Sequence, residues 1–123
     1  MAKILMFNIE SKKAAGIKLL CSGLGIGYHE VDRTEYGKPI GVLLGIAEND
    51  GTKPDSDFDE EMLYLVDIGG DLLNALLYDL RRRKLGVGLK AVMTDTNIGF
   101  TSYELYRELS AEREAIQKGA TAH

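Results

Sequence analysis

Four short apolar runs alternate with segments of helical periodicity, and this alternation limits the fold more than any other feature of the sequence. The runs cover residues 3–9, 27–32, 62–68 and 89–94. Apolar runs of this length are typical of strands. Strands that are separated by helices favour a mostly parallel sheet, because a parallel neighbour needs a crossover connection. We therefore predict an α/β fold, a small three-layer α/β/α domain with a four-stranded, mostly parallel sheet.

The simplest strand order for such a chain is 2-1-3-4. Right-handed crossovers would then place helices on both faces of the sheet. In parallel sheets ligands bind beyond the carboxyl ends of the strands, at the point where the strand order reverses. This rule predicts one polar rim, which we take as the candidate ligand-binding site, made of Asn8, Glu10, Asp67, Gly69, Gly70, Thr94, Thr96 and Asn97.

The segment after the first run has one apolar helical face. Ile17, Leu20, Cys21 and Leu24 follow the i, i+3, i+4, i+7 spacing. We expect Ser11 to cap the start of this helix and Gly25 to end it in the left-handed conformation. Cys21 lies on the apolar face, which indicates packing and not reactivity.

The stretch YLVDIGGDLL, residues 64–73, joins the third run to a leucine-rich helical segment. Asp71 is expected to cap that helix. Residues 81–84 are all basic, and positive charge is favourable at the last turn of a helix. The simplest interpretation of the glycine pair is a tight turn from strand to helix.

Three functional interpretations of this turn are open beside the structural one. A nucleotide-cofactor loop would need several strand–helix units downstream, and only about fifty residues follow. A receiver-like phosphoacceptor would use Asp67 with Thr94, yet it lacks an acidic pair after the first strand and a lysine after a fifth. Anion binding at the helix start is opposed by the charges of Asp67 and Asp71.

Composition and charge exclude several classes of protein. The net charge is −4, and residues 48–61 hold seven acidic residues and one lysine. The basic run lacks interleaved aromatic residues, so we expect no nucleic-acid partner. Asp55, Asp57 and Asp59 lack the glycine and distal glutamate of a calcium loop, which favours a solvated acidic loop.

The organisation of the chain follows from its length and its hydropathy. We predict a single domain over residues 1–118, with a frayed tail at 119–123. No window approaches the apolar length needed to span a bilayer, and the start lacks a signal peptide. We therefore expect a cytoplasmic protein without a membrane partner.

Three stretches at fixed spacing carry a resemblance. EMLYLVDI, LLNALLYDLRR and LKAVMTDTNIGFTSYELYREL, within residues 61–109, resemble a family of short bacterial α/β proteins of unknown function. The resemblance implies a small α/β domain and supplies no catalytic residue. Asp67 stands where the family usually has glycine, and Phe100 where it commonly has tryptophan. Thr94, Thr96 and Asn97 match the polar loop of the family, where their side chains are expected to satisfy backbone groups.

The functional expectation is a non-catalytic binding or regulatory module. His29 and Cys21 form no credible catalytic arrangement, and one cysteine with two histidines favours neither a metal site nor a cofactor. The partner would be a protein or a small molecule at the polar rim. The alternative is a degenerate receiver-like domain that uses Asp67 and Thr94. A third hypothesis is self-association of two chains through an edge strand.

Overall fold

The computed structural model describes residues 1–48 and 58–121, with backbone alone for 119–121. The acidic segment falls largely outside these residues, so the predictions for Asp55 and Asp57 are not addressed. The chain forms two compact units. Residues 1–31 and 59–93 make up the sheet unit, and residues 32–58 and 94–123 make up the helical unit.

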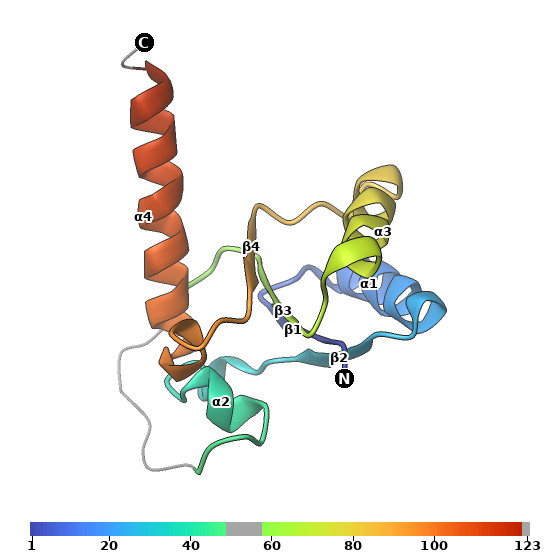
Figure 1. Ribbon diagram of the computed structural model, residues 1–123, viewed down its shortest axis with the longest axis horizontal. Coiled ribbons are helices and arrows are strands. Elements are labelled where there is room, and N and C mark those ends of the chain that lie inside the picture. Colours follow the sequence, from blue (N-terminus) through green and yellow to red (C-terminus); the bar gives the residue numbers. More distant parts are fainter. Residues whose placement is uncertain (49–57, 122–123) are drawn as a thin grey trace. The chain divides into compact units, whose positions relative to one another are not determined.

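The sheet unit holds all four strands and two helices (Figure 1). The strand order is β2-β1-β3-β4, so the predicted order and the α/β class are confirmed. Each strand is slightly shorter than the apolar run that predicts it. The elements are β1 (Lys3–Phe7), α1 (Ser11–Leu24), β2 (Gly27–Glu30), β3 (Met62–Val66), α3 (Gly70–Arg82) and β4 (Leu89–Val92).

The sheet is mixed, because its two central strands run in opposite directions. β1 is parallel to β2, and β3 is parallel to β4. β1 is antiparallel to β3, with Lys3 opposite Val66 and Phe7 opposite Met62. Two of the three strand pairs are parallel, so the expectation of a mostly parallel sheet is confirmed, and the antiparallel central pair makes the sheet mixed.

Both helices of the sheet unit cover the same face of the sheet. Their buried residues form one core with alternate residues of β1 and β3, and α1 lies beside α3 (Figure 1). Two right-handed crossovers in opposite directions would lie on opposite faces of a parallel sheet. Here β3 runs antiparallel to β1, so a half-turn about the sheet normal relates the second crossover to the first. Such a rotation keeps both crossover helices on one face of the sheet. The prediction that these two helices lie on opposite faces is therefore wrong.

This half-turn relates two equivalent βα halves, a repeat that the sequence did not reveal to us. As far as the ends of α1 and α3, residues of the second half lie 59 positions after their counterparts (67 − 8 = 59). Both Asn8 and Asp67 have positive φ angles, 58° and 55°. Both helices end in the same way, with a left-handed residue at Gly25 and at Lys84. The amide that follows each donates to a helix carbonyl, Ile26 to Cys21 and Leu85 to Leu80.

The second half differs from the first by an insertion. β2 begins immediately after Ile26, whereas Gly86, Val87 and Gly88 separate Leu85 from β4. Lys3 pairs with Gly27, and its counterpart Met62 pairs with Leu89. The two halves therefore return to equivalent register after the insertion.

The ends of the two helices correct two predictions and confirm two others. Glu10, not Ser11, caps α1, and its carboxylate accepts from the amides of Lys12 and Lys13. Gly69 occupies the cap position of α3 without a side-chain acceptor, and Asp71 lies in the first turn. The left-handed end of α1 at Gly25 is confirmed. Cys21 is fully buried in the core, as predicted.

The helical unit is built on a short helix and a long one. It contains η1 (Arg33–Glu35), α2 (Ile40–Leu43), η2 (Asn97–Gly99) and α4 (Ser102–Thr121). Phe58 stacks between Tyr36 and Tyr106, with ring centroids 4.8 and 4.7 Å apart. The amide of Ile40 donates to the carbonyl of Phe100, which ties α2 to the segment before α4. The helix extends to Thr121, so part of the predicted tail is helical.

Candidate functional site

The predicted polar rim is divided by the direction of the central strands. Asn8 and Glu10 follow β1, and Asp67 and the glycine pair follow β3. Because β1 and β3 are antiparallel, their carboxyl ends lie at opposite ends of the sheet. The prediction of one shared rim is wrong for these residues. Whether any of them binds a ligand stays a prediction.

At the β1 end the side chains hold the backbone together. The side-chain amide of Asn8 donates a hydrogen bond to the backbone carbonyl of Glu60 over 3.2 Å. The Glu10 amide donates to a carboxylate oxygen of Glu61, whose other oxygen lies 2.5 Å from the Lys13 ammonium. Hydrogen bonds from the Lys12 and Lys13 amides lower the pKa of the Glu10 carboxyl. Both predicted residues therefore have structural roles at this end.

At the β3 end the turn contains the glycine pair and one ion pair of Asp67. Asp67 is half-exposed, and its carboxylate lies 2.9 Å from the α-amino group of Met1. Gly69 is extended and Gly70 has a φ of 55°. A left-handed residue at Gly70 favours glycine, which explains the tight turn. The charges of Asp67 and Asp71 still oppose an anion at this helix start.

The polar loop after β4 belongs to the helical unit and forms two successive caps. The Thr94 amide donates to the Asn97 side chain over 2.8 Å, and the Asn97 amide donates to the Thr94 hydroxyl over 2.9 Å. Thr101 and Glu104 repeat this exchange at the start of α4, where they form a capping box. The predicted turn chemistry is confirmed for Thr94 and Asn97. Thr96 is exposed and makes no side-chain cap.

A groove of about 250 Å³ lies between α3 and β4, within the sheet unit. We call it the α3–β4 groove. Arg81 and Lys90 are its charged residues, and the Lys90 ammonium donates to the carbonyl of Val87 over 2.6 Å. The aliphatic part of its lining includes two nearly fully buried residues, Leu80 and Val87. The groove is lined by Leu77, Leu80, Arg81, Gly86, Val87 and Lys90.

The equivalent place in the first half is bridged by an ion pair. Lys18, the counterpart of Leu77, lies 2.5 Å from Glu30, the counterpart of Val92. The Lys18 ammonium also lies 6.0 Å from the ring centroid of Tyr28, which corresponds to Lys90. The same scaffold is therefore crossed by a salt bridge in one half and has an aliphatic groove with two cations in the other.

The α3–β4 groove contains none of the predicted site residues. The sequence holds two signals for it, the basic run at residues 81–84 and the inserted GVG. The basic run alone is explained by the end of α3, where Arg82 pairs with Asp79 over 3.5 Å. The insertion becomes visible only when the two halves are aligned, which requires the structure.

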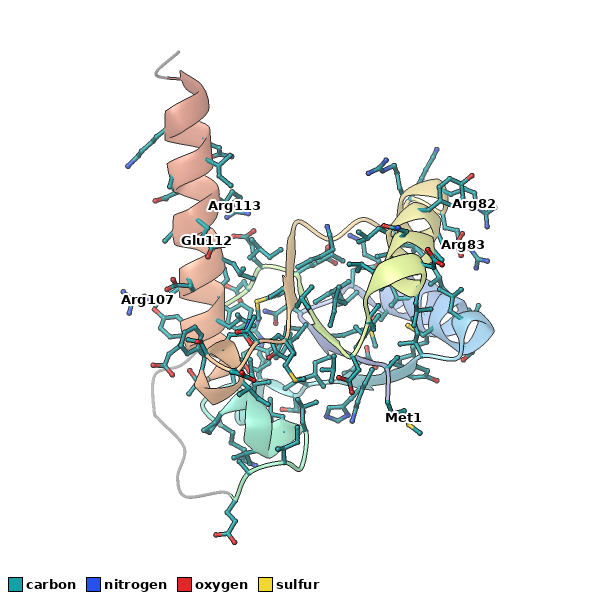
Figure 2. The ribbon with its side chains drawn as sticks, in the orientation of Figure 1. Met1, Arg82, Arg83, Arg107, Glu112 and Arg113 are labelled. Carbon is teal, nitrogen blue, oxygen red and sulfur yellow. The ribbon has the colours of Figure 1, made fainter. Side chains whose placement is uncertain are left out.

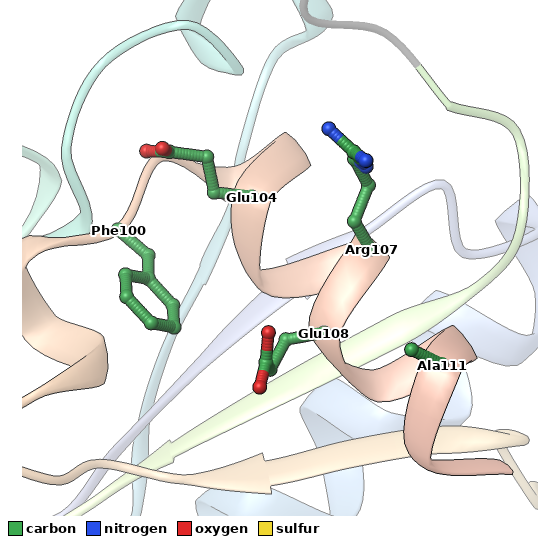
Figure 3. Close-up of a pocket in the computed structure, with 5 residues that line it drawn as sticks. All are labelled: Phe100, Glu104, Arg107, Glu108 and Ala111. Carbon is green, nitrogen blue, oxygen red and sulfur yellow. The ribbon is translucent and has the colours of Figure 1, made fainter. Parts of the chain in front are cut away.

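A second hollow, of about 310 Å³, lies at the start of α4 (Figure 3). Phe100 and Glu108 are on one side of its lining, and Arg107 extends from the other. Glu104 contributes to the lining, but one of its oxygens is bound to the Thr101 amide. Arg107 lies 5.9 Å from the ring centroid of Tyr103. Glu104 and Arg107 therefore have neighbours at the start of α4.

The buried ionisable groups belong to the core and not to a site. Burial raises the pKa of the Cys21 thiol to about 11 and that of the Tyr64 hydroxyl to about 12. Cys21 is therefore a poor nucleophile near neutral pH. Among residues 1–48 and 58–121, no group of histidine, cysteine or acidic side chains is arranged to hold a metal ion. In the same part of the chain, no helix has the length and apolar character to cross a membrane.

Comparison with known protein families matches the second half of the chain. No curated protein and no solved structure matches the chain. The region that matches a family model covers β3, α3, β4 and most of α4, and thus includes the whole α3–β4 groove and both polar caps. Residues 61–116 of this chain match a domain of unknown function, DUF3783.

Proposed function

We propose that this chain is a non-catalytic binding module that holds an anionic group of its partner in the α3–β4 groove. The observation that carries the proposal is the difference between the two halves. The inserted residues Gly86 and Val87 line the groove, and the equivalent place in the first half is crossed by Lys18 and Glu30.

The chemistry of the groove fits a carboxylate or a similar anion on an apolar body. Arg81 can donate two parallel hydrogen bonds to a carboxylate, and Lys90 adds a second positive charge. The Lys90 ammonium has three donor hydrogens, and its contact with Val87 uses one of them. Leu77 is half-buried beside them and adds aliphatic surface.

A binding role is favoured over catalysis because the polar residues of the matched region hold backbone groups. Thr94, Asn97, Thr101 and Glu104 form the two caps of the polar loop. In the α3–β4 groove, both charged side chains are cations that bind and orient an anion.

The test is a titration of the intact chain with sodium hexanoate, followed by amide chemical shifts. We expect shifts that saturate in the millimolar range at Leu80, Val87 and Lys90. Hexan-1-ol is the matched neutral probe and should bind more weakly. Absence of saturable shifts at these amides would contradict the proposal.

A charge-neutral variant gives the sharper control. Leu77→Lys combined with Val92→Glu copies the ion pair of Lys18 and Glu30 into the second half. We expect this variant to lose hexanoate binding while its net charge is unchanged. Arg81→Gln with Lys90→Gln should also lose binding and leaves the apolar core intact. Unchanged binding in both variants would show that the anion binds elsewhere.

A further inference from the structure

We infer that the partner of the α3–β4 groove is an acidic segment of another protein, with an aliphatic side chain among its carboxylates. This inference rests on the proposed function and names the partner class of the same site. Three observations support it. The basic residues continue beyond the groove, the apolar lining of the groove is aliphatic, and the one large apolar residue in the chain's own acidic stretch is buried.

The positive charge extends beyond the groove. Arg81 and Lys90 line it, and three further basic residues follow Arg81 in the chain, Arg82, Arg83 and Lys84. Figure 2 shows Arg82 and Arg83 at the end of α3, and both are exposed. Among the described residues of the sheet unit, Arg82 pairs with Asp79, and no ion pair involves Arg81, Arg83 or Lys84. A single small anion could use two of these cations, whereas an extended acidic chain could reach more.

The lining of the groove favours an aliphatic side chain over a nucleic-acid base. Its apolar residues are Leu77, Leu80 and Val87, and no aromatic residue is among them. Single-stranded nucleic acids gain much of their affinity by stacking bases on aromatic rings. The whole chain also carries a net charge of −4, which disfavours a polyanion that binds by charge alone.

A second copy of this chain is a poor source of the segment. Its most acidic stretch contains one large apolar residue, Phe58. Phe58 is 6% exposed and stacks between Tyr36 and Tyr106 in the helical unit. To place Phe58 in the groove of another copy, the chain would have to give up this stack. The occupant is therefore a segment of a different protein.

The test measures binding of a labelled heptapeptide, DLELDLE in one-letter code, to the intact chain by fluorescence anisotropy. Two matched peptides separate the contributions, NLQLNLQ without charge and DGEGDGE without leucine. We expect DLELDLE to bind about ten-fold or more tightly than either, because it alone satisfies both the cations and the aliphatic surface. Affinity should fall with added salt.

Two variants locate the site. Arg81→Gln with Lys90→Gln should weaken DLELDLE binding about ten-fold or more. Lys12→Gln with Lys18→Gln removes the same charge from the first half and should leave binding nearly unchanged. If one variant fails to fold, amide shifts of the wild-type chain on peptide addition locate the site instead.

The outcomes distinguish this inference from the proposed function. Hexanoate binding without DLELDLE binding would overturn the peptide inference and retain the anion groove. Tighter binding of a seven-nucleotide oligothymidylate than of DLELDLE would overturn it in favour of nucleic acid. Equal binding of DGEGDGE would also overturn it, since the aliphatic surface would then have no part. Peptide-dependent shifts confined to the groove would support it.

Discussion

The two βα halves of the sheet unit share their element order, strand pairing and left-handed residues, and differ in surface chemistry. In the first half Lys18 and Glu30 form an ion pair between α1 and β2. In the second half the counterparts are Leu77 and Val92, and an insertion of three residues precedes β4. Two of the inserted residues, Gly86 and Val87, line the groove that carries our proposal. Side chains that differ at equivalent positions of the two halves are not needed for the fold, and such positions are therefore candidates for function.

The same comparison shows which features the scaffold does require. Both strand ends place a residue at positive φ, Asn8 and Asp67, and these are among the non-glycine residues that adopt this conformation most readily. Both helices end at a left-handed residue followed by a buried or half-buried apolar one. Both helices also bury a large aliphatic residue at the same position, Ile17 and Leu76. These shared features give predictions that test whether the halves are energetically equivalent.

The largest effect is expected from the shared core position. Ile17→Ala and Leu76→Ala each remove a fully buried aliphatic side chain. Each should lower the free energy of unfolding by about 2–5 kcal/mol, because a cavity remains in a core common to both helices. Urea denaturation measures both values. Leu19→Ala, at a position that is 71% exposed, should change stability by less than about 0.5 kcal/mol. A large loss in one half with none in the other would contradict energetic equivalence.

The left-handed helix ends give a smaller effect of opposite sign in the two halves. Gly25 has a φ of 72° and nothing within 4 Å of an added Cβ, so Gly25→Ala tests backbone strain alone. It should cost about 1 kcal/mol, whereas Lys84→Gly should stabilise by a similar amount. Lys84→Gln is the control, since it removes the same charge and keeps the strain. Thermal unfolding measures all three, and a loss of stability in Lys84→Gly would contradict the strain.

Sequence periodicity was sufficient for the elements and their order, and insufficient for strand direction. The apolar runs identify β1 to β4, and the apolar face with Cys21 identifies α1. The direction of β3 relative to β1 depends on the long connection that includes the acidic segment. Such a connection accommodates either direction, so no local pattern specifies it. The prediction that Asn8 and Asp67 share one rim is wrong because β3 runs antiparallel to β1.

The cap residues show a different limit of sequence patterns. Ser11 and Asp71 are good cap residues by type, but each helix begins one or two residues earlier than a cap at these positions allows. Boundaries shift easily because the first turn can be satisfied by several neighbouring side chains. A capping box such as Thr101 with Glu104 is a more specific pattern, because it constrains two residues at once. The α3–β4 groove was missed because its basic residues also suit a helix end.

One core position holds an ionisable side chain in the first half only, and this makes the stability of the chain depend on pH at high pH. Cys21 corresponds to Leu80, and burial raises the pKa of its thiol from 9.0 to about 11. Between these pH values the unfolded chain ionises the thiol and the folded chain does not, so stability falls as pH rises. Cys21→Val should flatten this fall in urea denaturation between pH 8.5 and 10. Tyr64, with a pKa of about 12, contributes above that range. If the free energy of unfolding falls equally steeply with pH in the wild type and in Cys21→Val, the burial of the thiol is contradicted.

The smallest effect concerns the cap position that Glu10 and Gly69 share. Gly69 has φ and ψ angles of −145° and 177°, which any residue can adopt, and open space around an added Cβ. Gly69→Ser should raise the free energy of unfolding by a few tenths of a kcal/mol, because the serine hydroxyl can accept a hydrogen bond from a backbone amide in the first turn of α3. Gly69→Ala cannot form this hydrogen bond and should not stabilise the chain in this way.

In the first half, Glu10→Gln weakens an existing cap. The lowered pKa of Glu10 means that its stabilisation is present above the ordinary carboxyl value and is lost as pH falls through the folded value. The stability difference between wild type and Glu10→Gln should therefore shrink on acidification, while the difference between Gly69→Ser and wild type stays constant. Urea denaturation at several pH values measures both. A difference for Gly69→Ser that follows pH in the same way would mean that charge near α3, and not the cap itself, sets its stability.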